Sequence, residues 1–375
     1  MSRHRKQRSS GGYRLVLAGV AAAVVLAFVL NLALARLNPQ SADEQTAYVS
    51  GESTPVLPTS PSPAVTLAFA GDVHFAGRTA DLLDDPSSAF GPISGVLAAA
   101  DIAMVNLETA ITERGTEEPK EFHFRAPPVA LDTLVAAGVD IASLANNHAV
   151  DYGRIGLDDT LDAIAEGPLP VVGIGPDAAS AYAPYRFDVR GVGISIFAAS
   201  QVSDRTYERW TATDDSPGIA STADRDRLLA GVSAASAAGD VVIVYLHWGI
   251  EGDECPTPEM TSLATDLSSA GADAIVGTHA HLMLGAGYLD ETGSRAYVAY
   301  GLGNFVWWLG QSFSDDTGVL TLTVQDGSVT GSMFTPALID DDGRPEPVRG
   351  ARALQQAAAF EELRGCADLL STPAV

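Results

Sequence analysis

The 375-residue sequence predicts an α/β domain built in layers and carried on an N-terminal membrane anchor. Three observations lead to this prediction. Short apolar runs alternate with helix-like stretches after Pro63, which is typical of sheets covered by helices. An apolar segment near the N-terminus is long enough to cross a bilayer. A hydrophobic fraction of 46% is ample for a core.

The predicted anchor covers residues 15–35 and follows a basic tail at residues 1–14. Only Gly19 and Asn31 interrupt the apolar run from Leu15 to Ala35, which spans about 31 Å as a helix. The basic flank places the tail in the cytoplasm and the rest of the chain outside. A cleaved signal peptide is the alternative, because Ala33-Leu34-Ala35 resembles a cleavage site. The run exceeds the usual length of a signal peptide's apolar core, which favours an uncleaved anchor.

The segment from residue 36 to residue 63 is rich in Pro, Ser and Thr. Such a composition cannot bury enough surface to fold, so it predicts an extended tether. Residues 64–348 then form the predicted α/β domain, and residues 349–375 a C-terminal helix. The expected location is the cell membrane, with the domain on the extracytoplasmic side.

Charge is distributed unevenly along the chain. Residues 1–36 hold six Lys and Arg and no acidic residue, which leaves 16 basic and 47 acidic residues in the remainder, a net charge of −31. A domain of this charge repels other polyanions, so nucleic acid is excluded as a partner.

The alternation of strands and helices can be assigned by residue range. Predicted strands are Val65–Ala70, Ile102–Val105, Val139–Ala145, Val171–Ile174, Val192–Phe197, Val241–Leu246, Ala274–Val276, Ala296–Tyr300, Val319–Val324 and Val329–Phe334. Predicted helices are Ile93–Ala100, Pro128–Ala137, Ile155–Ala165, Thr222–Ala238, Glu259–Ala270 and Ala351–Leu370. The last two strands suggest a hairpin around Asp326-Gly327. The two cysteines, Cys255 and Cys366, are expected to pair outside the cytoplasm, with two buried thiols as the alternative.

Histidines are concentrated at the ends of predicted strands. Outside the N-terminal tail the six are His74, His123, His148, His247, His279 and His281. Five of them lie within a few residues of a strand end, where ligands gather in open α/β sheets. Asp72-Val73-His74 places two ligand-type side chains on one side of an extended segment, because residues i and i+2 share a face.

Carboxylates and asparagines accompany these histidines. Asn106-Leu107-Glu108 and Asn146-Asn147-His148 both follow predicted strands. Asp, Glu, Asn and imidazole together form a ligand set for divalent Mn, Fe or Zn, and the absence of Cys argues against structural zinc. Taken singly, Asp72 fits a strand-end cap and Asn147 a turn residue. Five strand ends that all finish in ligand-type residues favour a metal site.

The order of these motifs resembles the calcineurin-like metallophosphoesterase superfamily, and within it the bacterial poly-γ-glutamate capsule biosynthesis (CapA-type) family. The residues that carry the resemblance are Gly71-Asp72, Asn106-Leu107-Glu108, Asn146-Asn147-His148 with Asp151 and Gly153, His247-Trp248-Gly249 with Glu251, Gly277-Thr278-His279-Ala280-His281, and Gly303-Asn304-Phe305. Together they cover about residues 65–310. The resemblance implies a four-layer α/β/β/α sandwich with two divalent metal ions at one edge.

The resemblance also implies roles for single residues. One ion would be held by Asp72, His74 and His281, and the other by Asn147, His247 and His279. Glu108 would bridge the two ions, in a position where the superfamily usually has Asp. His148 would be the general acid or the oxyanion stabiliser.

Three further residues are candidates on chemical grounds. Asp151 is expected to orient His148, with a helix N-cap as the alternative. Arg125 is suited to gripping a substrate carboxylate or phosphate, or is an ordinary surface arginine. Asn304 lines the site or caps a turn.

The resemblance implies a protein of capsule or cell-envelope synthesis with a metal-dependent hydrolase fold. Its expected partners are the membrane, other subunits of a polymer synthase, and an anionic polymer or phosphoester substrate. Two alternatives remain. One is a secreted phosphoesterase or nucleotidase, and the other is a non-enzymatic scaffold of a polymer synthase or export complex.

Overall fold

The computed structural model describes residues 63–289, 296–310 and 313–373. The predicted basic tail, the anchor and nearly all of the linker lie outside the described residues. Within these ranges, no helix is both long and apolar enough to span a bilayer.

An eight-stranded sheet runs in the order β18-β17-β16-β1-β2-β5-β6, and β15 pairs with part of β1. Strands β2, β5, β6 and β15 are parallel to their neighbours, and β16 to β18 are antiparallel. The bounds are β1 (Val65–Val73), β2 (Ile102–Leu107), β5 (Ile141–Ser143), β6 (Val171–Val172), β15 (Asn304–Val306), β16 (Asp316–Gln325), β17 (Ser328–Ile339) and β18 (Pro345–Pro347).

A seven-stranded sheet runs in the order β19-β13-β14-β12-β11-β9-β8. Its strands are β8 (Tyr185–Val189), β9 (Val192–Ser200), β11 (Val241–His247), β12 (Ala274–Thr278), β13 (Ala286–Leu289), β14 (Tyr297–Ala299) and β19 (Leu369–Leu370). Two short pairs complete the strands: β3 (Ala110–Ile111) with β4 (Arg125–Ala126), and β7 (Ile174–Gly175) with β10 (Gly218–Ile219).

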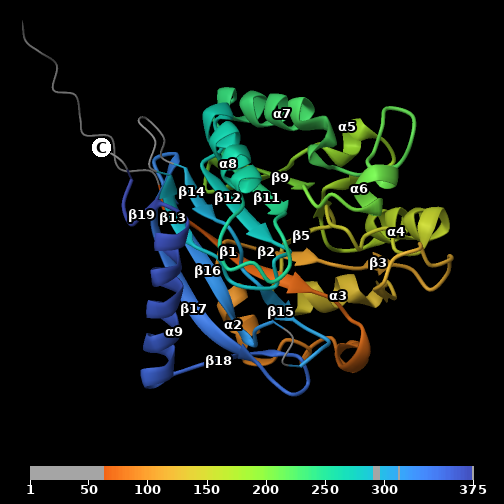
Figure 1. Cartoon of the computed structure of the whole chain (residues 1–375), viewed down its shortest axis with the longest axis horizontal. Helices are drawn as coiled ribbons and strands as arrows, with labels where there is room; N and C mark the ends of the chain where they lie inside the picture. The colour runs from red at the N-terminus through yellow and green to blue at the C-terminus, as the bar shows by residue number, and fades with distance from the viewer. Residues whose placement is uncertain (1–62, 290–295, 311–312, 374–375) are drawn as a thin grey trace, which may run out of the picture. The chain divides into compact units, whose positions relative to one another are not determined.

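The helices mostly fall between the strands along the chain. They are α2 (Ser94–Leu97), α3 (Val129–Ala136), α4 (Gly153–Glu166), α5 (Ala178–Ala181), α6 (Arg205–Trp210), α7 (Arg225–Ala237), α8 (Pro258–Ala270) and α9 (Gly350–Glu362). Short 3₁₀ turns are η1 (Gly77–Asp84), η2 (Gly91–Ile93), η3 (Thr222–Asp224) and η4 (Leu363–Cys366). Helices α7 and α8 lie over β9, β11 and β12, and α3 lies on the side of β1 and β2 (Figure 1).

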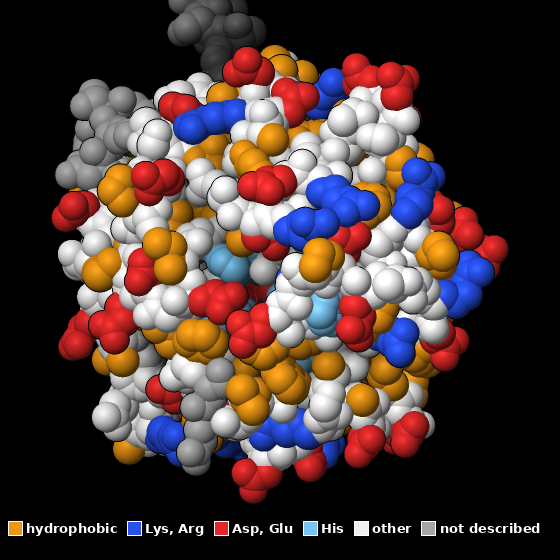
Figure 2. Space-filling model, turned by 45° about the vertical axis from the view of Figure 1, so that its right-hand side comes forward, with side chains coloured by type: hydrophobic (Ala, Val, Ile, Leu, Met, Phe, Trp, Pro, Cys, Tyr) orange, Lys and Arg blue, Asp and Glu red, His pale blue; other side chains and the backbone are white. Residues whose placement is uncertain are grey.

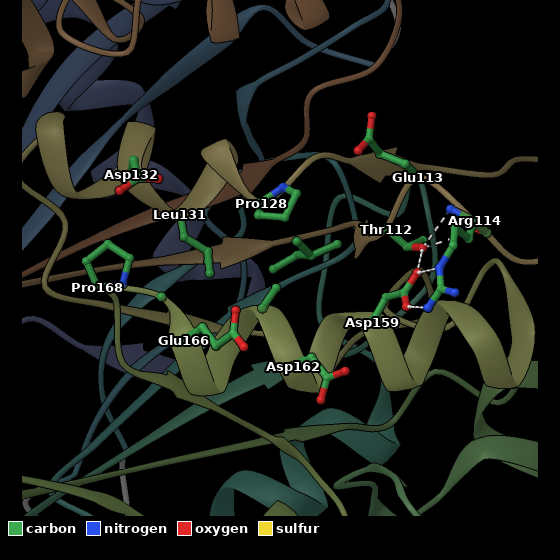
Figure 3. Close-up of a pocket in the computed structure, with 13 residues that line it drawn as sticks. Thr112, Glu113, Arg114, Pro128, Leu131, Asp132, Asp159, Asp162, Glu166 and Pro168 are labelled. Atoms are coloured by element: carbon green, nitrogen blue, oxygen red, sulfur yellow. Dashed lines mark hydrogen bonds and ion pairs between the residues drawn. The ribbon is translucent and has the colours of Figure 1, made fainter.

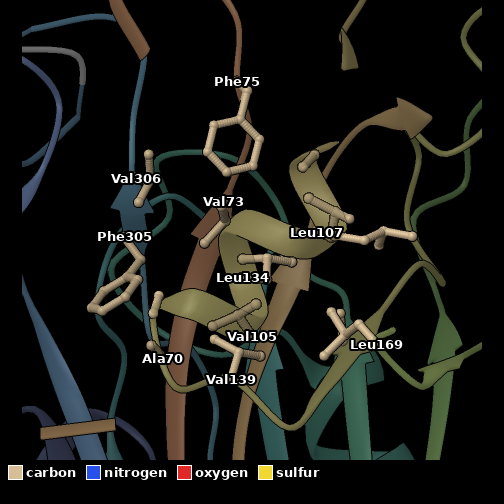
Figure 4. Close-up of a cluster of buried hydrophobic side chains, with 14 of the residues drawn as sticks. Ala70, Val73, Phe75, Val105, Leu107, Leu134, Val139, Leu169, Phe305 and Val306 are labelled. Atoms are coloured by element: carbon tan, nitrogen blue, oxygen red, sulfur yellow. The ribbon is translucent and has the colours of Figure 1, made fainter. Parts of the chain in front are cut away.

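Alternating side chains on the strands build three buried clusters. On β1, Leu67 and Phe69 join a cluster with residues of β9, β11 and β12, which fills the space between the two sheets. Ala68 and Ala70 point the other way, into a cluster with α3 and α4 (Figure 4). A third cluster joins β9 and β11 to α7 and α8. Period-two alternation thus buries both faces of each sheet, one against the other sheet and one against helices, in a mixed α/β fold.

Most predicted elements are present, and the C-terminal region differs. The hairpin at Asp326-Gly327 joins β16 to β17. The helix expected over residues 349–375 ends at Glu362, because the chain after it forms a 3₁₀ turn and then pairs as β19 with β13. Cys255 and Cys366 are joined in a disulfide with their Cα atoms 5.6 Å apart, as expected.

Candidate metal centre

Three neighbouring strands bring the first acidic residue to the edge of the eight-stranded sheet. Asp72, near the end of β1, is paired in register with Asn106 of β2 and with Asn304 of β15. Gly71 permits this approach, because a Cβ atom there would lie 1.9 Å from the main-chain oxygen of Gly303. Asn106 Nδ2 donates to Asp72 Oδ1 at 2.8 Å. The backbone therefore fixes Asp72 in a fully buried position.

Glu108 is the central carboxylate of the site. Its side chain is fully buried, and neither oxygen has a hydrogen-bond partner within the described part of the chain. Burial, with a smaller contribution from the charge of Asp72, raises the pKa of Glu108 well above its ordinary value. Glu108 also belongs to both groups of three ligand atoms that lie within 4.8 Å of one another, the groups Asp72–Glu108–His281 and Glu108–His247–His279.

His281 lies on the Asp72 side of Glu108. Its Nδ1 donates to Asn304 Oδ1 at 2.9 Å and lies 3.4 Å from Asp72 Oδ2. Burial alone would lower the pKa of His281, but the interactions with Asp72 and Glu108 outweigh it and raise the pKa to about 9. The ring therefore carries a proton at neutral pH when no cation is bound.

His247 and His279 form the second group of close ligand atoms with Glu108. His247 Nε2 is 3.3 Å from Glu108 Oε1 and 2.9 Å from Asn147 Oδ1. Burial lowers the pKa of His247 to about 4 and also lowers that of His279 well below its ordinary value. Both rings are therefore neutral near pH 7, the form in which imidazole binds metals. His279 adopts a positive φ of 91°, a strained conformation that is common at functional sites.

His148 lies next to the cluster and is hydrogen-bonded to the carboxylate of Asp151. Its Nδ1 donates to Asp151 Oδ2 at 2.7 Å, and its Nε2 lies 4.0 Å from Glu108 Oε1. Burial lowers the pKa of His148 to about 4, although the neighbouring Asp151 opposes the shift. Asp151 is therefore hydrogen-bonded to His148, its role in orienting the ring stays a prediction, and the free lone pair of His148 lies on the Glu108 side.

His74 is buried next to these residues against aromatic rings. It stacks on Phe124 with a centroid distance of 4.3 Å and meets Trp307 edge-on at 4.7 Å. Neither ring nitrogen has a hydrogen-bond partner among the residues described. Burial lowers the pKa of His74 well below its ordinary value. In the described ranges, His74 belongs to neither group of close ligand atoms, so its place as a ligand stays a prediction.

These residues fit a divalent cation on chemical grounds. A buried carboxylate is costly unless its oxygens are hydrogen-bonded or bind a cation, and neither oxygen of Glu108 has a hydrogen-bond partner among the described residues. His279 Nδ1 likewise has no partner in the described part of the chain. Oxygen and imidazole donors suit Mn, Fe or Zn. Figure 2 shows histidine side chains between acidic and hydrophobic side chains on one face of the molecule.

Two other features lie apart from this cluster. Arg125 is exposed, and its guanidinium lies 4.6 Å from the ring centroid of Tyr152. The structure therefore does not bring Arg125 to Glu108, whereas Asn304 contacts His281 directly. A cavity of about 490 Å³ between α3 and α4 is lined by acidic residues and by Leu131, and it contains none of the ligand-type residues of the cluster (Figure 3).

Sequence reasoning missed three polar residues that hold the site together. Asn106 bonds Asp72, and Asn146 Nδ2 donates to Asn106 Oδ1 at 3.0 Å. Asn146 Oδ1 also accepts from the main-chain N–H of His148 at 3.0 Å. Lys120 donates to Asp151 Oδ1 at 2.7 Å. The two asparagines stood inside quoted motifs and could have been chosen as structural partners, whereas Lys120 lies in a loop and carried no sequence signal.

Comparison with known proteins assigns the chain to a family. Residues 66–307 match the family model described as bacterial capsule synthesis protein PGA_cap. The chain belongs to this PGA_cap family. The matched residues run from β1 to Trp307, just past the Gly303-Asn304-Phe305 motif, and include every ligand-type residue of the cluster.

Two relatives and one solved structure illustrate the similarity. The PGA biosynthesis protein CapA of Bacillus subtilis is 28% identical over 316 residues, which cover 83% of this chain and 80% of CapA. A probable polyglutamine synthesis accessory protein of Mycobacterium tuberculosis is 31% identical over 244 residues, 61% of this chain and 62% of the relative. A phosphatase structure from Mycoplasma pneumoniae is 14% identical, covers 78% of this chain and 97% of its own, and has a TM-score of 0.43.

Proposed function

We propose that this PGA_cap protein acts in capsule polymer synthesis through a two-metal, hydrolase-like site at the outer face of the cell membrane. The observation that carries the proposal is Glu108, a buried carboxylate shared by two groups of close ligand atoms and without a donor among the described residues. Membership of the capsule synthesis family supports the biological process. The outward orientation rests on the apolar run and basic flank of the N-terminal sequence.

The proposed ligands form two sets, one for each ion, and both sets include Glu108. Asp72 and His281 hold one ion, with His74 as the third protein ligand that the superfamily resemblance implies. His247, His279 and Asn147 hold the other. When bound, two cations polarise a phosphoryl or acyl oxygen of the substrate and stabilise the charge that develops on it.

His148 carries the proton in this proposal. It is neutral near pH 7, because its pKa is about 4, and its Nδ1 is already committed to Asp151. Its Nε2 therefore first accepts a proton from the attacking water and then gives that proton to the leaving-group oxygen or nitrogen. Asp151 keeps the ring in the tautomer that leaves Nε2 free, and Glu108 lies on the Nε2 side.

The substrate proposed is an anionic γ-glutamyl polymer or a phosphorylated or acyl intermediate of its synthesis. The net charge of −31 outside the N-terminal segment repels such a substrate over most of the surface. Attraction is then confined to the cations at the site. Metal binding is therefore expected to be needed for substrate binding as well as for turnover.

The test is a turnover assay with the full chain purified in detergent. Phosphoesters and γ-glutamyl polymers are screened with Mn²⁺ against the wild type, His148→Ala and the control Arg125→Ala. We expect turnover in the wild type and in Arg125→Ala, and a loss of about 10²–10⁴-fold in His148→Ala. Metal binding without turnover, together with unchanged polymer output in a His247→Ala strain, would favour the scaffold alternative.

A further inference from the structure

Lys120 has an unusual position for the chain's rarest cationic residue. The sequence contains one other lysine, Lys6 of the basic tail. The side chain of Lys120 is 14% exposed. Its Nζ lies 2.6 Å from the main-chain oxygen of Asn147, 2.7 Å from Asp151 Oδ1 and 3.3 Å from His148 Nδ1. We propose that Lys120 is a positioning residue that locks Asn147 to the His148–Asp151 pair, an inference that rests on the function proposed above.

The lock acts on His148 through Asp151. His148 Nδ1 donates to Asp151 Oδ2, so the same nitrogen has no lone pair left to accept from Lys120. The main-chain N–H of Phe124 also donates to Asp151 Oδ2, at 2.7 Å. Lys120 holds the other carboxylate oxygen. With both oxygens engaged, the Asp151 carboxylate cannot rotate, and the His148 ring keeps its Nε2 toward Glu108.

The same ammonium holds the main chain at Asn147. The carbonyl oxygen of Asn147 accepts from Lys120 and from Thr206 Oγ1 of α6, the latter at 2.7 Å. Fixing this peptide unit fixes the backbone from which the Asn147 side chain extends, and the Oδ1 of that side chain lies 2.9 Å from His247 Nε2. Lys120 therefore couples a proposed metal ligand to the residue proposed to transfer the proton.

The loop that carries Lys120 is held in place by contacts of Glu118, which lies outside the site. Glu118, two residues earlier, donates its main-chain N–H to the main-chain oxygen of Asp151 at 2.8 Å. Its carboxylate pairs with Arg205 and Arg209 of α6, at 3.1 and 3.7 Å. The loop between β3 and β4 thus holds Lys120 in place. Arginine is not equivalent here, because its larger guanidinium holds all its donors in one rigid plane, whereas the compact ammonium of lysine can rotate its three donors toward the separate acceptors.

The test compares three variants of the full chain in detergent after metal removal. Lys120→Met deletes the ammonium, Lys120→Arg keeps a positive charge, and Thr206→Val removes the second donor to the Asn147 carbonyl without touching Asp151. Mn²⁺ affinity is measured by titration calorimetry. The ring N–H signal of His148 is followed by NMR with ¹⁵N-labelled histidine, which is feasible because the chain has seven histidines.

Lys120→Met is expected to bind Mn²⁺ about 10–100-fold more weakly, the usual effect of removing an outer-shell partner. It is also expected to lose the slowly exchanging Nδ1–H signal of His148, and Lys120→Arg should restore neither property. Thr206→Val should keep the His148 signal. Wild-type Mn²⁺ affinity together with an intact signal in Lys120→Met would overturn the proposal.

Two outcomes separate this inference from the proposed function. If the wild type itself binds no Mn²⁺, the proposed function fails, and the His148 signal alone then decides the role of Lys120. If Lys120→Met does not fold, the double variant Lys120→Met/Asp151→Asn removes both charges together. We expect that variant to fold and to bind Mn²⁺ weakly, and wild-type affinity in it would overturn the proposal.

Discussion

Replacing Glu108 with Gln should stabilise the metal-free protein and weaken its response to metal. A buried acceptor without a donor costs about 1–3 kcal/mol, and both oxygens of Glu108 are in this state among the described residues. Gln turns one of them into an N–H donor on the side of the free lone pair of His148 Nε2, which recovers about 1–3 kcal/mol. The unfolding midpoint of the metal-free protein should therefore rise by about 2–6 °C.

The effect depends on pH in a definite direction. The pKa of Glu108 is raised well above its ordinary value of 4.5, first by burial and then by the charge of Asp72. The folded chain thus holds this proton more tightly than the unfolded chain does. Metal-free wild type is therefore expected to lose stability as the pH rises from about 4.5 toward the folded pKa. Glu108→Gln lacks this loss, so the difference between the two midpoints should widen over that range.

The assay is thermal unfolding of both proteins with and without Mn²⁺. At a concentration 100 times its Kd, a ligand stabilises the folded state by about 2.7 kcal/mol, so the wild type should gain several degrees. Glu108→Gln should gain clearly less. A lower metal-free midpoint in Glu108→Gln, with an unchanged gain from Mn²⁺, would refute the reasoning.

Three other predictions follow from the same geometry. His281 has a pKa of about 9, so it must lose a proton before it can bind a cation. For each proton released, Mn²⁺ affinity should therefore increase about tenfold per pH unit between pH 7 and 9. A pH-independent affinity in calorimetry would contradict this. Asn304→Ala should reduce turnover more than Arg125→Ala, because Asn304 bonds His281 and Arg125 is exposed; equal losses of kcat/KM would count against it. Cys255→Ser should lower the free energy of unfolding by about 2–4 kcal/mol, since the disulfide to Cys366 spans 111 residues; an unchanged urea midpoint would show otherwise.

The site residues that could be predicted are those at the ends of strands, which lie together at one edge of the sheet. Asp72 and Glu108 follow apolar runs that the sequence identifies as strands, and the register of β1 with β2 brings them together. His247, at the end of β11, is placed by the same logic in the facing sheet. Strand ends converge in such folds whatever the loops do, so these residues could be chosen from the sequence.

The parts that escaped prediction depend on long-range pairing. Lys120 lies in a loop whose path is set by the contacts of Glu118 with α6. The hydrophobic periodicity of the sequence does not predict these contacts. Arg125 faces away from the cluster, because β4 pairs with β3 and turns its neighbour Phe124 inward instead. The C-terminal helix is shorter than expected because Leu369–Leu370 pairs with β13, a contact that helix propensity does not register.

The central claim is that Glu108 lies between two cations. Anomalous diffraction from crystals grown with Mn²⁺ tests it most directly. We predict two peaks, one on each side of the Glu108 carboxylate, with Asp72 and His281 at one and His247 and His279 at the other. No peak at Glu108, or peaks only at other positions, would contradict the account.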